Sequence, residues 1–212
     1  MTSPTPPTEP THAERTYRSG AGLVGGALLI LLVGWIGGDA VVQGEGRTPW
    51  LALAALLTVV PLIVAFTLRP AVFADEERIR IRNPFRTIVL PWTDVSSVRA
   101  SYSSEVFTHE GAKYQLWAVP VSLRERKRAA RKATQQAHDD PYGRASVHAD
   151  VRDSQARAAA ADRTVNDLRE LAERAEARKE AGAVTASVRW AYEVIAPAVV
   201  GAVLLVVLLA IG

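Results

Sequence analysis

Three long stretches of the chain are almost free of charged residues. They cover residues 20–42, 49–68 and 193–212, with Asp39 near the end of the first. A helix of about 20 apolar residues crosses a hydrocarbon layer roughly 30 Å thick. The pattern therefore predicts three transmembrane helices, the first two of which form a hairpin over residues 20–68.

Within residues 69–120 the hydrophobic pattern changes to alternation. In Arg78–Arg82 arginine and isoleucine alternate, so the isoleucines point to one face of a strand and the arginines to the other. Residues 83–86 have the composition of a turn, and residues 87–90 form the returning strand. Further strands are predicted at residues 72–73, 95–102 and 113–119. The region is therefore predicted to be a small antiparallel β domain.

Residues 121–192 are predicted to be a helical region, with a break at residues 139–143 and a long helix over residues 145–181. The least polar positions of this helix follow a heptad spacing that is filled mostly by alanine. They are Val147, Val151, Ser154, Ala158, Ala161, Val165, Leu168, Ala172 and Ala175. Two alternatives stay open: a weak coiled coil that makes the protein a homo-oligomer, or one helix that packs back on its own sheet.

The Pro- and Thr-rich residues 1–19 lack a hydrophobic set and are predicted to be a disordered tail. The positions of lysine and arginine predict how the chain crosses the membrane. Arg15 and Arg18 precede the first span, only Arg47 lies between the first two spans, and all other basic residues lie within residues 69–189. The tail and the β domain are therefore predicted to be cytoplasmic, and the C-terminus to lie outside a multi-pass cell-membrane protein.

The spans carry two further signals. Gly22 with Gly26, and Gly34 with Gly38, place small residues four apart, which permits close helix approach. Packing within the chain and a dimer face both fit this spacing, and the first is favoured. Residues typical of an interfacial anchor precede the last span. These are Arg189, Trp190 and Tyr192.

The sequence from Val72 to Val98 combines an Asn-Pro-Phe-Arg turn with Leu-Pro-Trp-Thr-Asp-Val. The residues that carry this motif are Asn83, Pro84, Leu90, Pro91, Trp92, Asp94 and Val95. Together with the hairpin of spans, it resembles the bacterial pleckstrin-homology (PH)-like membrane proteins of actinobacteria, of the low-molecular-weight protein antigen 6 type. The resemblance implies a strongly bent antiparallel sheet with seven strands and a capping helix. Only about five strands are recognisable before Pro120, so how the barrel closes is left open.

The net charge is only +3, but the basic residues are concentrated in two clusters. The first lies on the predicted strand and turn and consists of Arg78, Arg80, Arg82 and Arg86. The second lies on a predicted helix and consists of Arg124, Arg126, Lys127, Arg128, Arg131 and Lys132. Each can contact anionic lipid headgroups or an acidic partner, and each can equally be a solvated face. Aromatic residues that would stack on bases are not interleaved, so nucleic acid is not expected as a partner.

The sequence contains no recognisable catalytic, cofactor-binding or metal-binding pattern. The four histidines are scattered without ligand spacing, there are no cysteines, and no glycine loop precedes a helix. The chain is therefore predicted to be an α+β membrane protein that is not an enzyme. It is expected to present a PH-like domain to an unknown protein partner or to anionic lipid. The alternative is an accessory subunit of a membrane transporter or envelope complex.

Overall fold

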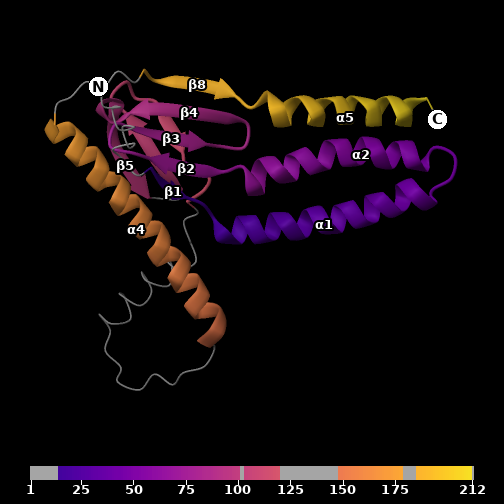
Figure 1. The fold of residues 1–212 in the computed structure, drawn as a ribbon, viewed down its shortest axis with the longest axis horizontal. Coiled ribbons are helices and arrows are strands. Elements are labelled where there is room, and N and C mark those ends of the chain that lie inside the picture. The colour runs from indigo at the N-terminus through magenta and orange to yellow at the C-terminus, as the bar shows by residue number, and fades with distance from the viewer. Residues whose placement is uncertain (1–13, 101–102, 120–147, 179–184, 212) are drawn as a thin grey trace, which may run out of the picture.

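The computed structural model describes residues 14–100, 103–119, 148–178 and 185–211. Figure 1 shows a β domain from which three helices extend side by side. Each is long and apolar enough to cross a membrane. These candidate spans are α1 (Gly20–Gln43), α2 (Thr48–Ile63) with its π-helical continuation η1 (Val64–Leu68), and α5 (Tyr192–Ala210).

Helix α2 packs against both α1 and α5. Gly26 of α1 lies directly against the side chain of Thr67, and a Cβ atom on Gly22 would lie 3.3 Å from the Thr67 carbonyl oxygen. The first glycine pair therefore packs within the chain, as predicted. In the described part of the structure, no atom lies close enough to contact a Cβ on Gly34 or Gly38.

Five antiparallel strands form sheet A, in the order β1-β2-β3-β4-β8. Its strands are β1 (Arg15–Tyr17), β2 (Ala71–Ala74), β3 (Arg78–Arg82), β4 (Arg86–Pro91) and β8 (Ser187–Trp190). The hairpin of β3 and β4 was predicted from its alternating pattern. The two outer strands were not predicted, because three or four residues are too few to show a periodic pattern.

The outer strands correct two sequence predictions. Residues 15–17, assigned to the disordered tail 1–19, pair with β2. Residues 187–190, assigned to the helical region 121–192, pair with β4 and lead directly into α5. Tyr17 stabilises β1, because its ring packs against the core and its hydroxyl donates to the Asp167 carboxylate at 3.3 Å. Burial raises the pKa of that hydroxyl.

Sheet B has three antiparallel strands, in the order β5-β6-β7. They are β5 (Val95–Ala100), β6 (Ser104–Thr108) and β7 (Lys113–Gln115), and the short 3-10 helix η2 (Trp92–Asp94) connects β4 to β5. Strand β6 was missed in the sequence, and β7 is shorter than the strand predicted over residues 113–119. The last two residues of the strand predicted over 95–102 lie outside the described residues. A register shift between Val95 and Ser97 bends β5.

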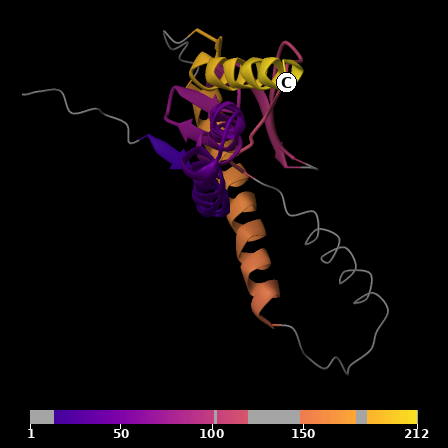
Figure 2. The ribbon, with the colours of Figure 1, turned by 90° about the vertical axis from the view of Figure 1, so that its right-hand side faces the viewer.

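The core lies between the two sheets and is closed by α4 (His148–Arg178), which Figures 1 and 2 show crossing the β domain and extending beyond it. Isoleucines of sheet A and valines of sheet B share this core with one face of the helix. Its buried residues are Val165, Leu168, Leu171 and Ala175. Three of these belong to the predicted heptad seam, so they pack on the chain's own domain and are not free for a coiled coil. The side chains of the seam before residue 162 are outside the described residues.

Candidate interaction surface

The outer face of sheet A is built by the residues that alternate with the core residues. The isoleucines of β3 are fully buried, so Arg78, Arg80 and Arg82 point away from the core. The antiparallel register places Phe73 and Val89 beside Arg80, and Ala71 and Thr87 beside Arg82. Because Thr87 also lies opposite Arg189 of β8, arginines from two strands share this face.

Two of these arginines, together with Arg18, cover one aromatic ring. The guanidinium carbons of Arg80, Arg82 and Arg18 lie 4.4, 5.2 and 6.0 Å from the centroid of the Phe73 ring. Only 9% of Phe73 stays exposed. Cation–π attraction of this kind contributes about 0.5–1 kcal/mol at a partly exposed site. The arginines of β3 are therefore packed side chains as well as surface charges.

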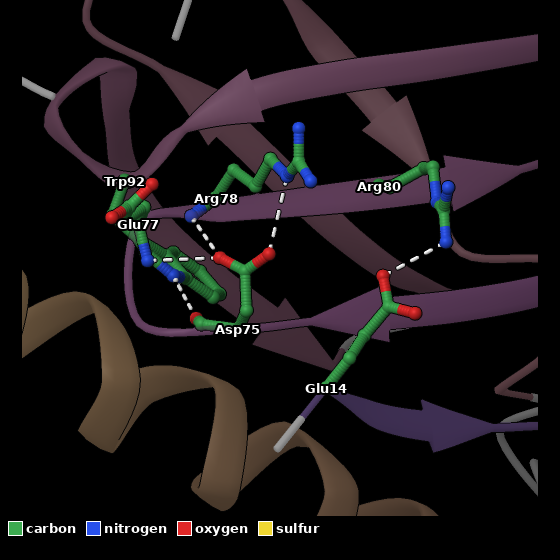
Figure 3. A network of polar contacts seen from close by, with 6 residues as sticks. All are labelled: Glu14, Asp75, Glu77, Arg78, Arg80 and Trp92. Atoms are coloured by element: carbon green, nitrogen blue, oxygen red, sulfur yellow. Dashed lines mark hydrogen bonds and ion pairs between the residues drawn. The ribbon is translucent and has the colours of Figure 1, made fainter. Parts of the chain in front are cut away.

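One end of sheet A adjoins the three candidate spans, and we call it the span end. The opposite end, at the turn Asp75–Arg78, is the far end. Figure 3 shows that an acidic residue organises the far end. The Asp75 carboxylate accepts hydrogen bonds from the backbone N–H groups of Glu77 (2.9 Å) and Arg78 (2.8 Å). It also pairs with the Arg78 guanidinium at 3.1 Å, so this arginine is neutralised locally.

Two further contacts complete the far end. The indole N–H of Trp92 donates to the Asp75 carbonyl at 2.8 Å, and the ring is only 2% exposed. Arg80 pairs with Glu14, which precedes β1, at 2.8 Å (Figure 3). Arg78 and Arg80, both predicted as parts of a binding surface, thus have carboxylate partners within the chain.

The span end has arginines without such partners. Within the described residues, Arg18, Arg82, Arg86 and Arg189 form no ion pair. Arg18 lies between β1 and α1, and the other three lie at the ends of β3, β4 and β8 that adjoin the spans. The structure therefore divides the predicted cluster into a neutralised half and an unpaired half.

Arg69, which sequence reasoning did not single out, holds the span end together. Its guanidinium donates to the Asn83 carbonyl at 2.5 Å, to the Thr87 hydroxyl at 3.2 Å and to the Glu193 carboxylate at 2.9 Å. The side chain of Arg69 is 12% exposed and that of Glu193 is 64% exposed. One residue thereby links the end of η1, the hairpin of β3 and β4, and the start of α5. Its position one residue after a predicted span was the signal available in the sequence.

The buried side chain of Asn83, the first residue of the Asn-Pro-Phe-Arg turn, joins the two sheets. Its side-chain amide donates to the Gln115 carbonyl at 2.9 Å, and its side-chain oxygen accepts from the Trp117 backbone N–H at 3.5 Å. The residue is 4% exposed. Because Gln115 ends β7, Asn83 joins the span end of sheet A to sheet B.

The remaining motif residues serve the fold. Leu90, Trp92 and Val95 are part of the core, and Pro84 and Pro91 are buried. The Asp94 carbonyl accepts from the His109 backbone N–H at 3.0 Å, which ties the start of β5 to the end of β6. These residues of the motif therefore build the core and the connection between the two sheets.

Aromatic residues gather at the span end. The rings of Phe66 and Phe85 meet edge to face at 5.2 Å, and Phe66 lies 5.6 Å from Trp117. Trp117 is 44% exposed, and Trp190 and Tyr192 are more exposed still. The predicted anchor residue Trp190 thus belongs to a strand, and it is accompanied by aromatic residues from the β domain.

The second basic cluster, Arg124 to Lys132, lies outside the described residues, so its prediction stays a prediction. In the part of the chain that the structure describes, no group of three His, Asp or Glu side chains is placed to hold a metal ion.

Two sheets packed around one core and capped by a helix define a PH-like domain, as the motif led us to expect. The sequence model of the family described as Bacterial PH domain matches residues 69–183, which is more than half of the chain. The protein belongs to this family. The matched region includes β2 to β7 and α4, but neither outer strand of sheet A nor any complete span. Comparisons with curated proteins and with solved structures found no similar protein.

Proposed function

We propose that this protein is a membrane-integral interaction module that acts by binding and not by catalysis. Its spans hold the bacterial PH domain in one orientation against the cytoplasmic leaflet, and its unpaired arginines contact anionic headgroups. The observation that carries this proposal is the direct continuation of three strands into the three candidate spans. Two residues separate β1 from α1, two separate η1 from β2, and Ala191 alone separates β8 from α5.

Such short connections support a fixed orientation, because a connection of one or two residues allows little independent rotation of the domain. They place Arg18 and Arg189 two and three positions from a span. Arg82 and Arg86 lie opposite Ala71 and Trp190, which are equally close to a span. The aromatic residues Trp117, Trp190 and Tyr192 have the amphipathic character of residues that lie at headgroup level. An arginine close to an anionic leaflet contributes about 1 kcal/mol to association with it.

The cytoplasmic side is inferred from the distribution of arginines. Arg47 is the only basic residue in the loop at the opposite end of the spans. The protein has no cysteine, so Glu45→Cys in that loop and Glu110→Cys in the turn between β6 and β7 each introduce a single exposed thiol. In intact cells, an impermeant maleimide should label the thiol of Glu45→Cys and not that of Glu110→Cys. The reverse pattern would refute the proposed orientation.

Lipid selectivity of the full-length protein in bilayers tests the headgroup contacts. Spin-labelled phosphatidylglycerol and phosphatidylcholine report the fraction of each lipid that the protein immobilises. The triple variant Arg82→Gln, Arg86→Gln, Arg189→Gln should lose the preference for phosphatidylglycerol, by up to about fivefold for each arginine.

The matched control is Arg78→Gln, Arg80→Gln, Arg174→Gln, which removes the same charge from arginines that pair with carboxylates of the chain itself. It should keep most of the preference. Equal losses in the two triple variants would show that only net charge attracts the lipid. An unchanged preference in the first variant would refute the headgroup contacts.

A further inference from the structure

Strand β8 forms an open edge of sheet A. It pairs with β4 on one side, and no described strand pairs with its other side. Figure 1 shows β8 at the rim of the sheet. All four of its residues are exposed. An exposed edge of this kind offers unpaired backbone groups to another strand.

The direction of these backbone groups follows from one hydrogen bond. The Ala191 N–H donates to the Phe85 carbonyl at 2.8 Å, so the backbone groups of Ala191 point toward the hairpin that contains β4. Backbone groups of alternate residues point to the same side of a strand. Those of Arg189 therefore also face β4, whereas those of Val188 and Trp190 face outward. The edge presents two N–H groups and two carbonyls.

The side chains of β8 alternate in chemistry. Val188 lies opposite Ile88, which is fully buried, yet 47% of Val188 is exposed. Trp190, on the same face, is 57% exposed. The apolar inner face of the sheet thus continues to the edge, where the described residues leave it exposed. Arg189 points to the outer face, where it lies opposite Thr87 in the row that also contains Arg82.

A second copy of this chain does not suit the edge. Strand β8 runs toward α5, so two copies inserted in the same orientation bring their β8 strands together in parallel. In a parallel pair, the backbone of a residue that faces the partner strand bonds to two partner residues, namely the ones before and after the residue directly opposite it. A residue such as Val188 must therefore lie opposite a partner residue of neighbouring number, and not opposite Val188 of the other copy. A two-fold axis along the strands forbids this arrangement, because it places identical residues side by side. This exclusion rests on the membrane insertion proposed above.

We propose that the open edge of β8 binds an extended segment of another protein in which acidic and apolar residues alternate. The segment adds to sheet A as an antiparallel strand and runs away from the spans. Its backbone bonds to Val188 and Trp190, its apolar side chains cover these two residues, and its carboxylates face Arg189. Strand addition of this kind obtains affinity from the backbone and specificity from alternate side chains.

The test uses full-length protein in phosphatidylcholine nanodiscs, where no anionic lipid competes. The probe is a fluorescent eight-residue peptide of alternating glutamate and valine, and the control peptide has lysine in place of glutamate. Anisotropy should show that the glutamate peptide binds and that the lysine peptide binds more weakly by tenfold or more. Equal binding of the two peptides, or no binding of the glutamate peptide, would overturn the proposal. Either result leaves the lipid experiment above unaffected.

Two substitutions at one position separate the backbone contact from the side-chain contact. Val188→Pro removes an outward N–H and keeps the hydrogen bonds to β4, since proline is tolerated in an edge strand. Val188→Ala keeps this N–H and shortens the side chain. Binding of the glutamate peptide should weaken about tenfold in Val188→Pro and only a few-fold in Val188→Ala. Equal losses in the two variants would count against strand addition.

Amide hydrogen exchange in the unmodified chain gives a readout that does not depend on the proline variant. The amides of Val188 and Trp190 should exchange rapidly in the free protein and slowly with the glutamate peptide bound. The amide of Arg189, which faces β4, should be protected in both states. Unchanged exchange at Val188 would overturn the proposal.

Val188→Cys provides a last check, because a disulfide between two copies in the bilayer would show that a second copy occupies the edge.

Discussion

The two ends of sheet A carry the same residue type in opposite settings. At the far end Arg78 pairs with Asp75, and Arg80 pairs with Glu14. At the span end Arg82 and Arg189 form no ion pair within the described residues. The difference shows that the arginines of one strand do not all contribute to the same positively charged surface. Neighbouring acids neutralise some of them, and the others form no ion pair within the described residues, although Arg82 adds to the attraction that Arg69 exerts on the Glu193 carboxylate.

The two ends also differ in how the fold fixes them. A buried indole and a largely buried carboxylate fix the far end, through Trp92 and Asp75. A buried amide and a nearly buried guanidinium fix the span end, through Asn83 and Arg69. The hydrogen bonds of Trp92 and Asp75 therefore stay within the stretch from β2 to η2, whereas those of Asn83 and Arg69 also reach sheet B and α5.

Trp92→Ala at the far end should have the largest effect on stability. Removing a buried aromatic side chain lowers the free energy of unfolding by about 3–5 kcal/mol. Chemical unfolding of the full-length protein in micelles measures this change. The comparison variant is Trp190→Ala at the span end, where the ring is 57% exposed, and it should cost no more than about 1 kcal/mol. Similar costs for the two variants would contradict the assignment of Trp92 to the core.

Asn83→Ala should have the next largest effect, about 2–3 kcal/mol, because it leaves the Gln115 carbonyl and the Trp117 N–H without their partner. Asp75→Ala is the far-end counterpart. It should cost about 1–2 kcal/mol, since the bonds that it removes are at the surface and the Asp75 backbone still accepts from Trp92. If Asp75→Ala cost more than Asn83→Ala, the far end would depend more on its polar contacts than the span end does, contrary to this ranking.

A smaller difference should separate two arginines. Arg78→Gln removes a partly exposed ion pair and should lower the free energy of unfolding by about 0.2–1 kcal/mol at low salt. This cost should shrink as salt is added. Arg189→Gln removes no ion pair within the described residues, and its effect should stay within about 0.5 kcal/mol at any salt concentration. A salt-dependent loss in Arg189→Gln would reveal a partner for this arginine.

Glu105 on sheet B provides a reference that belongs to neither end. Hydrogen bonds from Ser103 and Lys113 hold the pKa of Glu105 below its usual value of 4.5. A lowered pKa means that the carboxylate stabilises the fold at neutral pH, and that this contribution is lost as pH falls through 4.5 and below. Glu105→Gln should therefore reduce stability by about 0.5 kcal/mol at pH 7 and by less at pH 3. A difference that grew at low pH would contradict the sign.

The candidate site could be predicted only in part. The β3 arginines were found because their alternation with isoleucine is a local pattern. Arg69 was missed because its role depends on Asn83, Thr87 and Glu193, which lie 14, 18 and 124 positions away. Likewise, Asp75 and Glu14 carried no sequence signal that they would neutralise Arg78 and Arg80.

The sequence by itself determined the three candidate spans, the hairpin of β3 and β4 and the family motif, because each depends on composition or periodicity within a short stretch of chain. Only the tertiary structure decided the outer strands, the packing of α4 on its own core, and the split of the arginines into paired and unpaired sets. The physical reason is that these features depend on residues far apart in the chain. Strand β1 is stabilised by pairing with β2 and by the contact of Tyr17 with α4, and β8 is stabilised by pairing with β4.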